Sequence, residues 1–236
     1  MARTYLGHVI LETLAEKARP ESTALLVIDM QNDFVHDDGY CAGAFGRPMV
    51  RGFQAIVPAL RDLTAAARAA RVPVIYAKVS QLPDGSLASP VWLADALRRG
   101  YEPLHCMRGT WGWEIIDELR PQPGDIVMEK PRRSAFQGTN LENLLRARGV
   151  RSIVATGIAG SGCVNATVRD AIERDYFTIV VADAIADNTA EMTEACVANY
   201  RSLVASEDLT TTAQLAALWA GNAKPAAGDA EPASDA

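Results

Sequence analysis

Cysteine and histidine are scarce in this sequence, and neither follows a ligand or disulfide pattern. The 236 residues include four cysteines and three histidines, and no two cysteines have the CxxC spacing. A disulfide framework and a cysteine zinc site are therefore excluded, and such thiols are typical of a protein in the reducing cytoplasm. The histidines, His8, His36 and His105, are too scattered for a histidine metal site, so we expect neither a metal nor a cofactor.

Positive charge and long apolar runs are also missing. The chain has 23 Lys and Arg against 29 Asp and Glu, which leaves a net charge of −6. This balance disfavours nucleic acid and anionic membranes as partners. No apolar run approaches the ~20 residues that span a bilayer, and residues 1–21 lack the apolar core of a signal peptide. With 49% hydrophobic residues, we expect a soluble globular protein that buries a core of its own.

Short runs rich in β-branched residues alternate with longer helical patterns. The run 24–29 is apolar up to its final Asp29, which is typical of a strand buried on both faces. The other predicted strands are residues 73–77, 125–128, 152–156, 177–182 and 203–205. The predicted helices are residues 49–70, 139–149 (with Thr139 and Glu142 as a capping box), a segment from about 163, 191–200 and 210–219. This alternation predicts an α/β fold with a parallel sheet between helices.

The domain organisation follows from where this alternation starts and stops. We predict an N-terminal arm at 1–21, a single catalytic domain at 22–221 and a disordered tail at 222–236, where Ala, Pro, Asp and Glu dominate. The stretch 80–124 is less regular and holds three of the four tryptophans. It predicts short helices and loops near the mouth of a site.

Three reactive side chains fall where strands of such a sheet end. Asp29 ends the first strand, Lys130 stands just after the third, and Cys163 follows the fourth through a glycine-rich turn. Ligands of open parallel sheets bind beyond the carboxyl ends of the strands, so an acid/base, a cation and a nucleophile would meet there. Taken singly, each residue has an ordinary interpretation: a loop cap, a solvated charge and an inert buried thiol.

The surroundings of Cys163 favour a nucleophile. The predicted helix continues from residue 164, so the sulfur lies at a helix N-terminus, where the partial positive charge favours thiolate over thiol. Backbone N–H groups there are suited to hold an oxyanion, and we assign that role to Gly160 and Cys163. Gly160 and Gly162 let the backbone approach a substrate closely.

Three motifs resemble those of the isochorismatase-like cysteine hydrolases. They are ALLVIDMQNDF at 24–34, EKP followed by SAF at 129–136, and TGIA followed by CV and TVRDA at 156–171. The resemblance covers roughly residues 22–206 in the right order. It implies a three-layer αβα sandwich around a six-stranded, mainly parallel sheet, a catalytic trio of Asp29, Lys130 and Cys163, and a homo-oligomer, either dimer or tetramer.

Within that family the sequence is most similar to hydrolases of ureides and carbamoyl amides. The shared features are GY at 39–40, GWEIIDEL at 112–119 and PGDIV at 123–127. The resemblance implies an amidohydrolase of nitrogen metabolism that cleaves a C–N bond of a compound such as ureidoacrylate, biuret or triuret. One position departs from the pattern: the family threonine three residues before the cysteine is Gly160 here, and the resemblance implies a cis peptide entering that position.

The residues that bind the substrate are less determined. Arg132 and Arg133 are suited either to hold a carboxylate in a planar fork or to remain solvated charges, and both interpretations stay open. The aromatic candidates either wall the site or belong to the core. The full set of substrate-binding candidates is Gln31, Phe34, Trp113, Arg132, Arg133 and Phe136.

Other functions fit the sequence less well than an amidohydrolase does. A metal-dependent nicotinamidase is rejected because residues 77–84 contain no histidine, and a haloacid dehalogenase-type phosphatase would want an Asp where Gln31 stands. A vinyl ether hydrolase of the isochorismate type does not need a cysteine, so the presence of Cys163 makes that interpretation less favoured. A non-catalytic binding or redox-sensing member of the fold also stays open.

Overall fold

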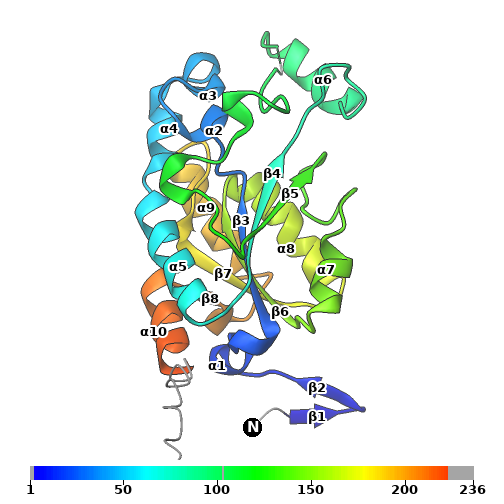
Figure 1. Ribbon diagram of the computed structural model, residues 1–236, viewed down its shortest axis with the longest axis vertical. Helices are drawn as coiled ribbons and strands as arrows, with labels where there is room; N and C mark the ends of the chain where they lie inside the picture. The colour runs from blue at the N-terminus through cyan, green and yellow to red at the C-terminus, as the bar shows by residue number, and fades with distance from the viewer. Residues whose placement is uncertain (1–2, 103, 223–236) are drawn as a thin grey trace, which may run out of the picture.

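The computed structural model describes residues 3–102 and 104–222 and contains a six-stranded sheet in the order β5-β4-β3-β6-β7-β8 (Figure 1). Every neighbouring pair is parallel. The strands are β3 (Thr23–Ile28), β4 (Val74–Val79), β5 (Ile126–Lys130), β6 (Ser152–Gly157), β7 (Phe177–Ile185) and β8 (Leu209–Thr210). The predicted three-layer fold around six strands is confirmed.

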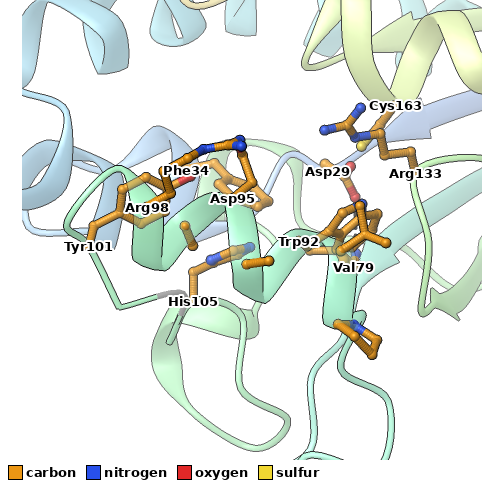
Figure 2. Close-up of a pocket in the computed structure, with 14 residues that line it drawn as sticks. Asp29, Phe34, Val79, Trp92, Asp95, Arg98, Tyr101, His105, Arg133 and Cys163 are labelled. Carbon is orange, nitrogen blue, oxygen red and sulfur yellow. Dashed lines mark hydrogen bonds and ion pairs between the residues drawn. The ribbon is translucent and has the colours of Figure 1, made fainter.

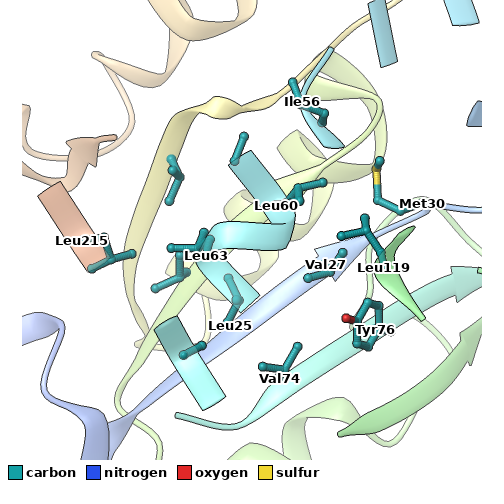
Figure 3. Close-up of a cluster of buried hydrophobic side chains, with 14 of the residues drawn as sticks. Leu25, Val27, Met30, Ile56, Leu60, Leu63, Val74, Tyr76, Leu119 and Leu215 are labelled. Atoms are coloured by element: carbon teal, nitrogen blue, oxygen red, sulfur yellow. The ribbon is translucent and has the colours of Figure 1, made fainter. Parts of the chain in front are cut away.

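Helices cover both faces of the sheet, and β3, β4 and β6 are accordingly buried at every position. Along β3, Leu25 and Val27 face one hydrophobic cluster, whereas Leu26 and Ile28 face the other. The first cluster is closed by α5 (Val57–Ala69) and α10 (Thr212–Asn222), and Figure 3 shows Leu60 and Leu215 from these helices in one cluster with Leu25 and Val27 of β3. The second is closed by α7 (Leu141–Ala147), α8 (Asn165–Ile172) and α9 (Ala190–Tyr200).

The predicted helix at 49–70 is interrupted. It consists of α4 (Arg47–Gln54) and α5, which are separated at Ala55 and Ile56. Pro58 stands in the first turn of α5, where its missing N–H costs nothing. A proline at the same place inside one continuous helix would remove a hydrogen bond and clash with the preceding turn. The chain therefore starts a new helix there.

Two local predictions were wrong. The predicted strand at 203–205 is a turn, in which the N–H groups of Leu203 and Val204 donate to the Tyr200 carbonyl at the end of α9. The last strand is instead β8. The predicted capping box is also absent: Asn140 is the N-cap of α7, without a side-chain cap, and the Glu142 carboxylate contacts Arg174 at 3.1 Å.

The predicted N-terminal arm contains an antiparallel hairpin of β1 (Arg3–Tyr5) and β2 (His8–Ile10), followed by α1 (Leu14–Lys17) and the turn η1 (Pro20–Ser22). Figure 1 shows the hairpin at the edge of the molecule. Lys17 forms a buried ion pair with Asp208 at 2.6 Å, and the Trp219 indole donates to the Ala18 carbonyl at 2.9 Å. These contacts fasten α1 to the domain. Of the predicted tail at 222–236, Asn222 is the last residue of α10 (Thr212–Asn222), and residues 223–236 lie outside the described residues.

Loops and short helices follow β3 and β4 at the carboxyl edge of the sheet. They include the predicted irregular stretch 80–124, where α6 stands apart from the sheet in Figure 1. No helix in the described part of the chain is both long and apolar enough to span a bilayer. The short elements of this edge are α2 (Asn32–Val35), α3 (Tyr40–Ala44), α6 (Pro90–Arg98), η2 (Trp111–Trp113) and η3 (Asp117–Leu119), whereas η5 (Ser206–Asp208) lies directly before β8.

Candidate active site

Asp29, Lys130 and Cys163 meet at the carboxyl edge of the sheet. Asp29 follows β3, Lys130 is the last residue of β5, and Cys163 lies in a π-helical turn, η4 (Gly160–Val164), after β6. The strand order places β4 between β3 and β5, so the Lys130 side chain reaches across the end of β4. Its ammonium lies 2.9 Å from Oδ2 of Asp29. The structure thus brings the three side chains together, as their positions after strand ends predicted.

The Asp29 carboxylate is held from two sides. Its Oδ1 accepts a hydrogen bond from the Val79 backbone at 3.0 Å, and its Oδ2 contacts Lys130. The residue has a φ of +57°, a left-handed conformation that Asp tolerates better than most residues. This bend turns the chain sharply at the end of β3 and leaves the carboxylate with one orientation.

Lys130 is fully buried, yet it stays charged. Burial, the largest single influence, would by itself lower the pKa of its ammonium group, but Asp29 and Cys163 together outweigh burial and raise that pKa above its ordinary value. Nζ also donates to the Arg132 carbonyl at 3.1 Å. A buried charge is tolerated when it is paired and hydrogen-bonded in this way. The pair therefore presents a fixed carboxylate and a fixed cation to the thiol.

In the folded protein Cys163 is held as a thiol, although the helix N-terminus expected from the sequence would favour thiolate. Burial raises the pKa of this thiol to about 12, the charge of Asp29 raises it too, and Lys130 opposes both. The sulfur belongs to the π-helical turn, and α8 begins only at Asn165. Both Asp29 and Lys130 lie within hydrogen-bonding range of the sulfur. The thiol thus needs a proton acceptor, and Asp29 is in place.

Gly160 does not offer a free N–H group, so its predicted oxyanion role is corrected. Its N–H donates to the Ala186 carbonyl at 2.8 Å, and its own carbonyl accepts from the Tyr200 hydroxyl. Glycine is required for a different reason: a Cβ would lie 2.8 Å from the sulfur of Cys196. The cis peptide bond also lies one residue earlier than predicted, between Ile158 and Ala159.

A cavity of about 840 Å³ opens over Asp29 and Cys163 (Figure 2). Of the predicted substrate-binding residues, Phe34 and Arg133 line it. Most of the opposite wall comes from α6, which lies in the stretch 80–124 that we expected near the mouth of a site, although none of its residues was a predicted substrate-binding candidate. The further lining residues are Val79, Pro90, Val91, Trp92, Ala94, Asp95, Ala96, Arg98, Tyr101 and His105. A Ser89-Pro90 helix start within the stretch after the second strand is the signal that would have placed this wall.

Gln31 and Trp113 lie beside the cavity rather than in it. Gln31 is fully buried and its amide group holds two loops together, since it donates to the carbonyls of Val79 and Trp113 and accepts from the Val79 N–H. The Trp113 ring lies under the Lys78 ammonium, 3.0 Å from the ring centroid, and its indole donates to Ser80. Both residues shape the site through these contacts.

Arg132 and Phe136 are also absent from the described cavity lining. Arg132 donates to the carbonyls of Leu87 and Pro131, at 3.0 and 2.7 Å. Phe136 is buried, and its ring packs against Tyr176 with centroids 5.9 Å apart. Substrate contact by these two residues is not supported by their positions.

His105 is an unusual polar residue in the wall. Its Nδ1 is buried and has no hydrogen-bond partner among the described residues, and its ring packs against Phe34 and Tyr40 at centroid distances of 5.4 and 5.3 Å. Burial lowers the pKa of His105, so the ring is neutral at neutral pH. Over residues 3–102 and 104–222, no group of three or more His, Cys, Asp or Glu side chains is placed to hold a metal ion.

Comparisons with known proteins agree on one family. The Isochorismatase domain model matches residues 23–214. A ureidoacrylate amidohydrolase RutB of Methylorubrum extorquens is 40% identical over 184 residues, which cover 71% of this chain and 73% of that protein. The ureidoacrylate amidohydrolase RutB of Agrobacterium fabrum is 38% identical over 177 residues, covering 70% and 76%.

Solved structures give the same answer. A cysteine hydrolase from Pseudomonas syringae pv. phaseolicola has a TM-score of 0.74 and 27% identity, over 86% of this chain and 94% of that one. The N-carbamoylsarcosine amidase of Thermoplasma acidophilum has a TM-score of 0.63 and 31% identity, over 81% and 96%. The predicted family is confirmed. Because the domain match spans most of the sequence and the fold agrees, the chain belongs to the isochorismatase family of hydrolases.

Proposed function

We propose that this protein is a cysteine amidohydrolase that cleaves a C–N bond of a small ureide or carbamoyl compound. The observation that carries the proposal is the contact of one thiol with a fixed carboxylate and a fixed ammonium on the floor of a cavity. The similarity to ureidoacrylate amidohydrolases supports the ureide class. The similarity to an N-carbamoylsarcosine amidase supports a carbamoyl group at the scissile bond.

The first half of the reaction forms an acyl-enzyme. The Cys163 thiol gives its proton to Asp29 as Sγ attacks the carbonyl carbon, and Lys130 stabilises the negative charge that then moves between sulfur and carboxylate. The tetrahedral oxyanion is held by backbone N–H groups of the η4 turn. Asp29 passes the proton to the leaving nitrogen, the C–N bond breaks, and ammonia or an amine departs.

Ala159 replaces Gly160 as the proposed partner of Cys163 in the oxyanion hole. It immediately precedes η4, and among the described residues no acceptor takes its N–H, whereas the N–H of Gly160 is occupied by Ala186. An unoccupied donor next to the nucleophile is what a developing oxyanion requires.

The second half of the reaction regenerates the thiol. Water loses a proton to Asp29 as its oxygen attacks the acyl carbon, the C–S bond breaks, and the sulfur takes the proton back. For a ureide, the acyl group is a carbamoyl, and the product is a carbamate that loses carbon dioxide. One water is consumed for each C–N bond that is cleaved.

Ammonia release from a panel of ureides, combined with mass spectrometry of Cys163, tests the proposal. The panel contains ureidoacrylate, biuret, triuret, N-carbamoyl amino acids and simple amides. We expect ammonia from at least one ureide and a transient carbamoyl adduct on Cys163. An oxidised thiol without an adduct or turnover would favour the redox-sensing alternative, and turnover of isochorismate alone would favour the vinyl ether hydrolase.

Replacing the nucleophile gives the sharpest variant. Cys163→Ser should lower turnover by roughly 1000-fold or more while the circular dichroism spectrum and Tm stay near the wild-type values, because a serine hydroxyl is a much weaker nucleophile. Cys41→Ala, in α3, is the matched control and should retain turnover, since this cysteine does not line the cavity. Substantial activity in Cys163→Ser would refute the cysteine mechanism.

A further inference from the structure

We propose that the substrate is an anion and that Arg133 binds its carboxylate at the mouth of the active-site cavity. This inference rests on the proposed amidohydrolase function and names the class of ureide that the site accepts. It also decides between Arg132 and Arg133, which are adjacent and which the sequence alone does not distinguish. The structure separates them by their contacts.

Arg132 is engaged inside the protein through one of its guanidinium nitrogens. Its Nη1 donates to the carbonyls of Leu87 and Pro131, so the side chain connects the lysine loop with the segment before α6. Arg133 lines the cavity, and no carboxylate or carbonyl in the described chain is within hydrogen-bonding distance of its guanidinium group. Figure 2 shows this group directed towards Cys163 and Asp29.

The charges of the cavity leave one cation without a counterion. Asp29 is neutralised by Lys130 at 2.9 Å, and Asp95 is paired with both Arg98 and Arg99. His105 adds no charge, because burial keeps its ring neutral. Arg133 is therefore the one uncompensated charge among the described lining residues, in a protein whose net charge is −6. An anionic ligand is what such a site attracts.

The orientation of Arg133 suits a carboxylate rather than a diffuse anion. Its guanidinium carbon lies 5.8 Å from the centroid of the Trp92 ring, on the first turn of α6, and this contact holds the planar group at one side of the cavity. A planar guanidinium forms two parallel hydrogen bonds with a carboxylate. With the carbonyl carbon at Cys163, the substrate extends from the thiol to Arg133, as a short carboxylate-bearing ureide would.

Steady-state kinetics on an acid and a neutral ureide test the assignment. Ureidoacrylate and N-carbamoylglycine carry the carboxylate, whereas biuret does not, and ammonia release reports on all three. In Arg133→Gln, kcat/KM for the acids should fall about 10- to 100-fold further than kcat/KM for biuret, mostly through KM, since a hydrogen-bonded charge pair is lost. Arg133→Lys should lie between, because it keeps the charge without the fork.

Arg98→Gln is the matched control. This arginine also lines the cavity, but it is already paired with Asp95, which retains Arg99 as a partner. The preference for acid over biuret should change by less than about twofold, a factor worth well under 1 kcal/mol. Binding of ureidoacrylate to Cys163→Ala and to Cys163→Ala/Arg133→Gln, measured by calorimetry, gives a readout that needs no turnover.

The outcomes separate the two proposals. Equal losses on acids and biuret in Arg133→Gln, or a wild-type preference for biuret, would overturn the carboxylate site while the amidohydrolase function stands. Absence of ammonia release and of a Cys163 adduct with every ureide would refute the proposed function. In that case the calorimetric comparison alone tests the carboxylate site. Equal affinity for ureidoacrylate in both variants would overturn that site.

Discussion

At the level of single residues, the resting site keeps the proton of Cys163 on its own sulfur. Burial and the charge of Asp29 together raise the pKa of the thiol to about 12, so the proton resides on sulfur at neutral pH. Transfer to Asp29 becomes favourable only as the sulfur attacks a carbonyl. A nucleophile controlled in this way reacts with bound substrate and is shielded from random oxidation, which requires thiolate.

Replacing Asp29 should separate turnover from thiol reactivity. Asp29→Asn cannot shuttle the proton, so kcat should fall about 100- to 10,000-fold. The same change removes a negative charge that raises the pKa of Cys163. Alkylation of Cys163 by iodoacetamide at mildly alkaline pH, followed by mass spectrometry, should therefore become faster than in the wild type. Slower alkylation would mean that Asp29 activates the resting thiol instead of holding it protonated.

At the level of secondary-structure elements, the site depends on how closely β3 and β6 approach at their carboxyl ends. Gly157 ends β6 opposite Ile28 of β3, with a φ of +104°. A Cβ at Gly157 would lie 2.1 Å from the Ile28 carbonyl oxygen, which is backbone and accepts the N–H of Ile158. Asp29 and the η4 turn both begin near this point, so the close approach positions the carboxylate relative to the thiol.

Gly157→Ala should destabilise the protein much more than Gly149→Ala. Both glycines have positive φ, but a Cβ at Gly149 meets nothing within 4 Å, so only the conformational cost of about 1–2 kcal/mol applies there. At Gly157 the steric cost adds to it, for a total loss of roughly 2–5 kcal/mol. Urea unfolding of the two variants measures the difference. Equal losses would show that β3 can move away from β6 freely.

At the level of the whole molecule, the neutral His105 links stability to pH. Burial is the main cause of its lowered pKa; Lys130 adds to it, and Asp33 and Asp29 oppose it. As pH falls through about 6.5, the value of an ordinary histidine, the unfolded chain takes up a proton that the folded chain refuses. Stability is therefore present above that pH and is lost progressively below it, down to the lowered pKa.

Removing the imidazole should flatten the acid side of the stability profile. In His105→Phe, a ring of similar size still packs against Phe34 and Tyr40 but does not titrate. The Tm difference between about pH 8 and about pH 5.5 should be smaller than in the wild type, by about 3 °C for each kcal/mol of linkage. His8→Phe, exposed on β2, is the control and should keep the wild-type difference. An unchanged profile in His105→Phe would contradict the neutral buried ring.

The domain boundaries, the cellular location and the oligomeric state are predictions. The domain at 22–221, the cytoplasmic location and the homo-oligomer rest on sequence patterns and on the family resemblance. Exposed apolar side chains on the N-terminal hairpin, Tyr5, Leu6 and Val9, are consistent with a contact between copies. Sedimentation at micromolar concentration would decide the oligomeric state.

The sequence by itself determined the layers of this fold and the three residues that meet at the carboxyl edge of its sheet. A run that is apolar at consecutive positions predicts a strand that is buried on both faces. Parallel strands place their carboxyl ends at the same edge of the sheet, independently of the loops that connect them. Asp29, Lys130 and Cys163 could therefore be placed together from strand ends alone. The helix break before Pro58 and the turn at 203–205 were not predicted, because short elements depend on hydrogen bonds that periodicity does not record.

Only the tertiary structure decided what each residue near the site does. The N–H of Gly160 is occupied by Ala186, the amide of Gln31 connects two loops, and Arg132 bonds to carbonyls of its own chain. The first two roles, and the contact of Arg132 with Leu87, are set by residues distant in the sequence. The raised pKa of the Cys163 thiol has the same origin: a helix N-terminus, which favours thiolate, is local and visible in the sequence, whereas burial and the charge of Asp29 come from packing. Electrostatic energies depend on distance in space and on exclusion of water, and folding alone determines both.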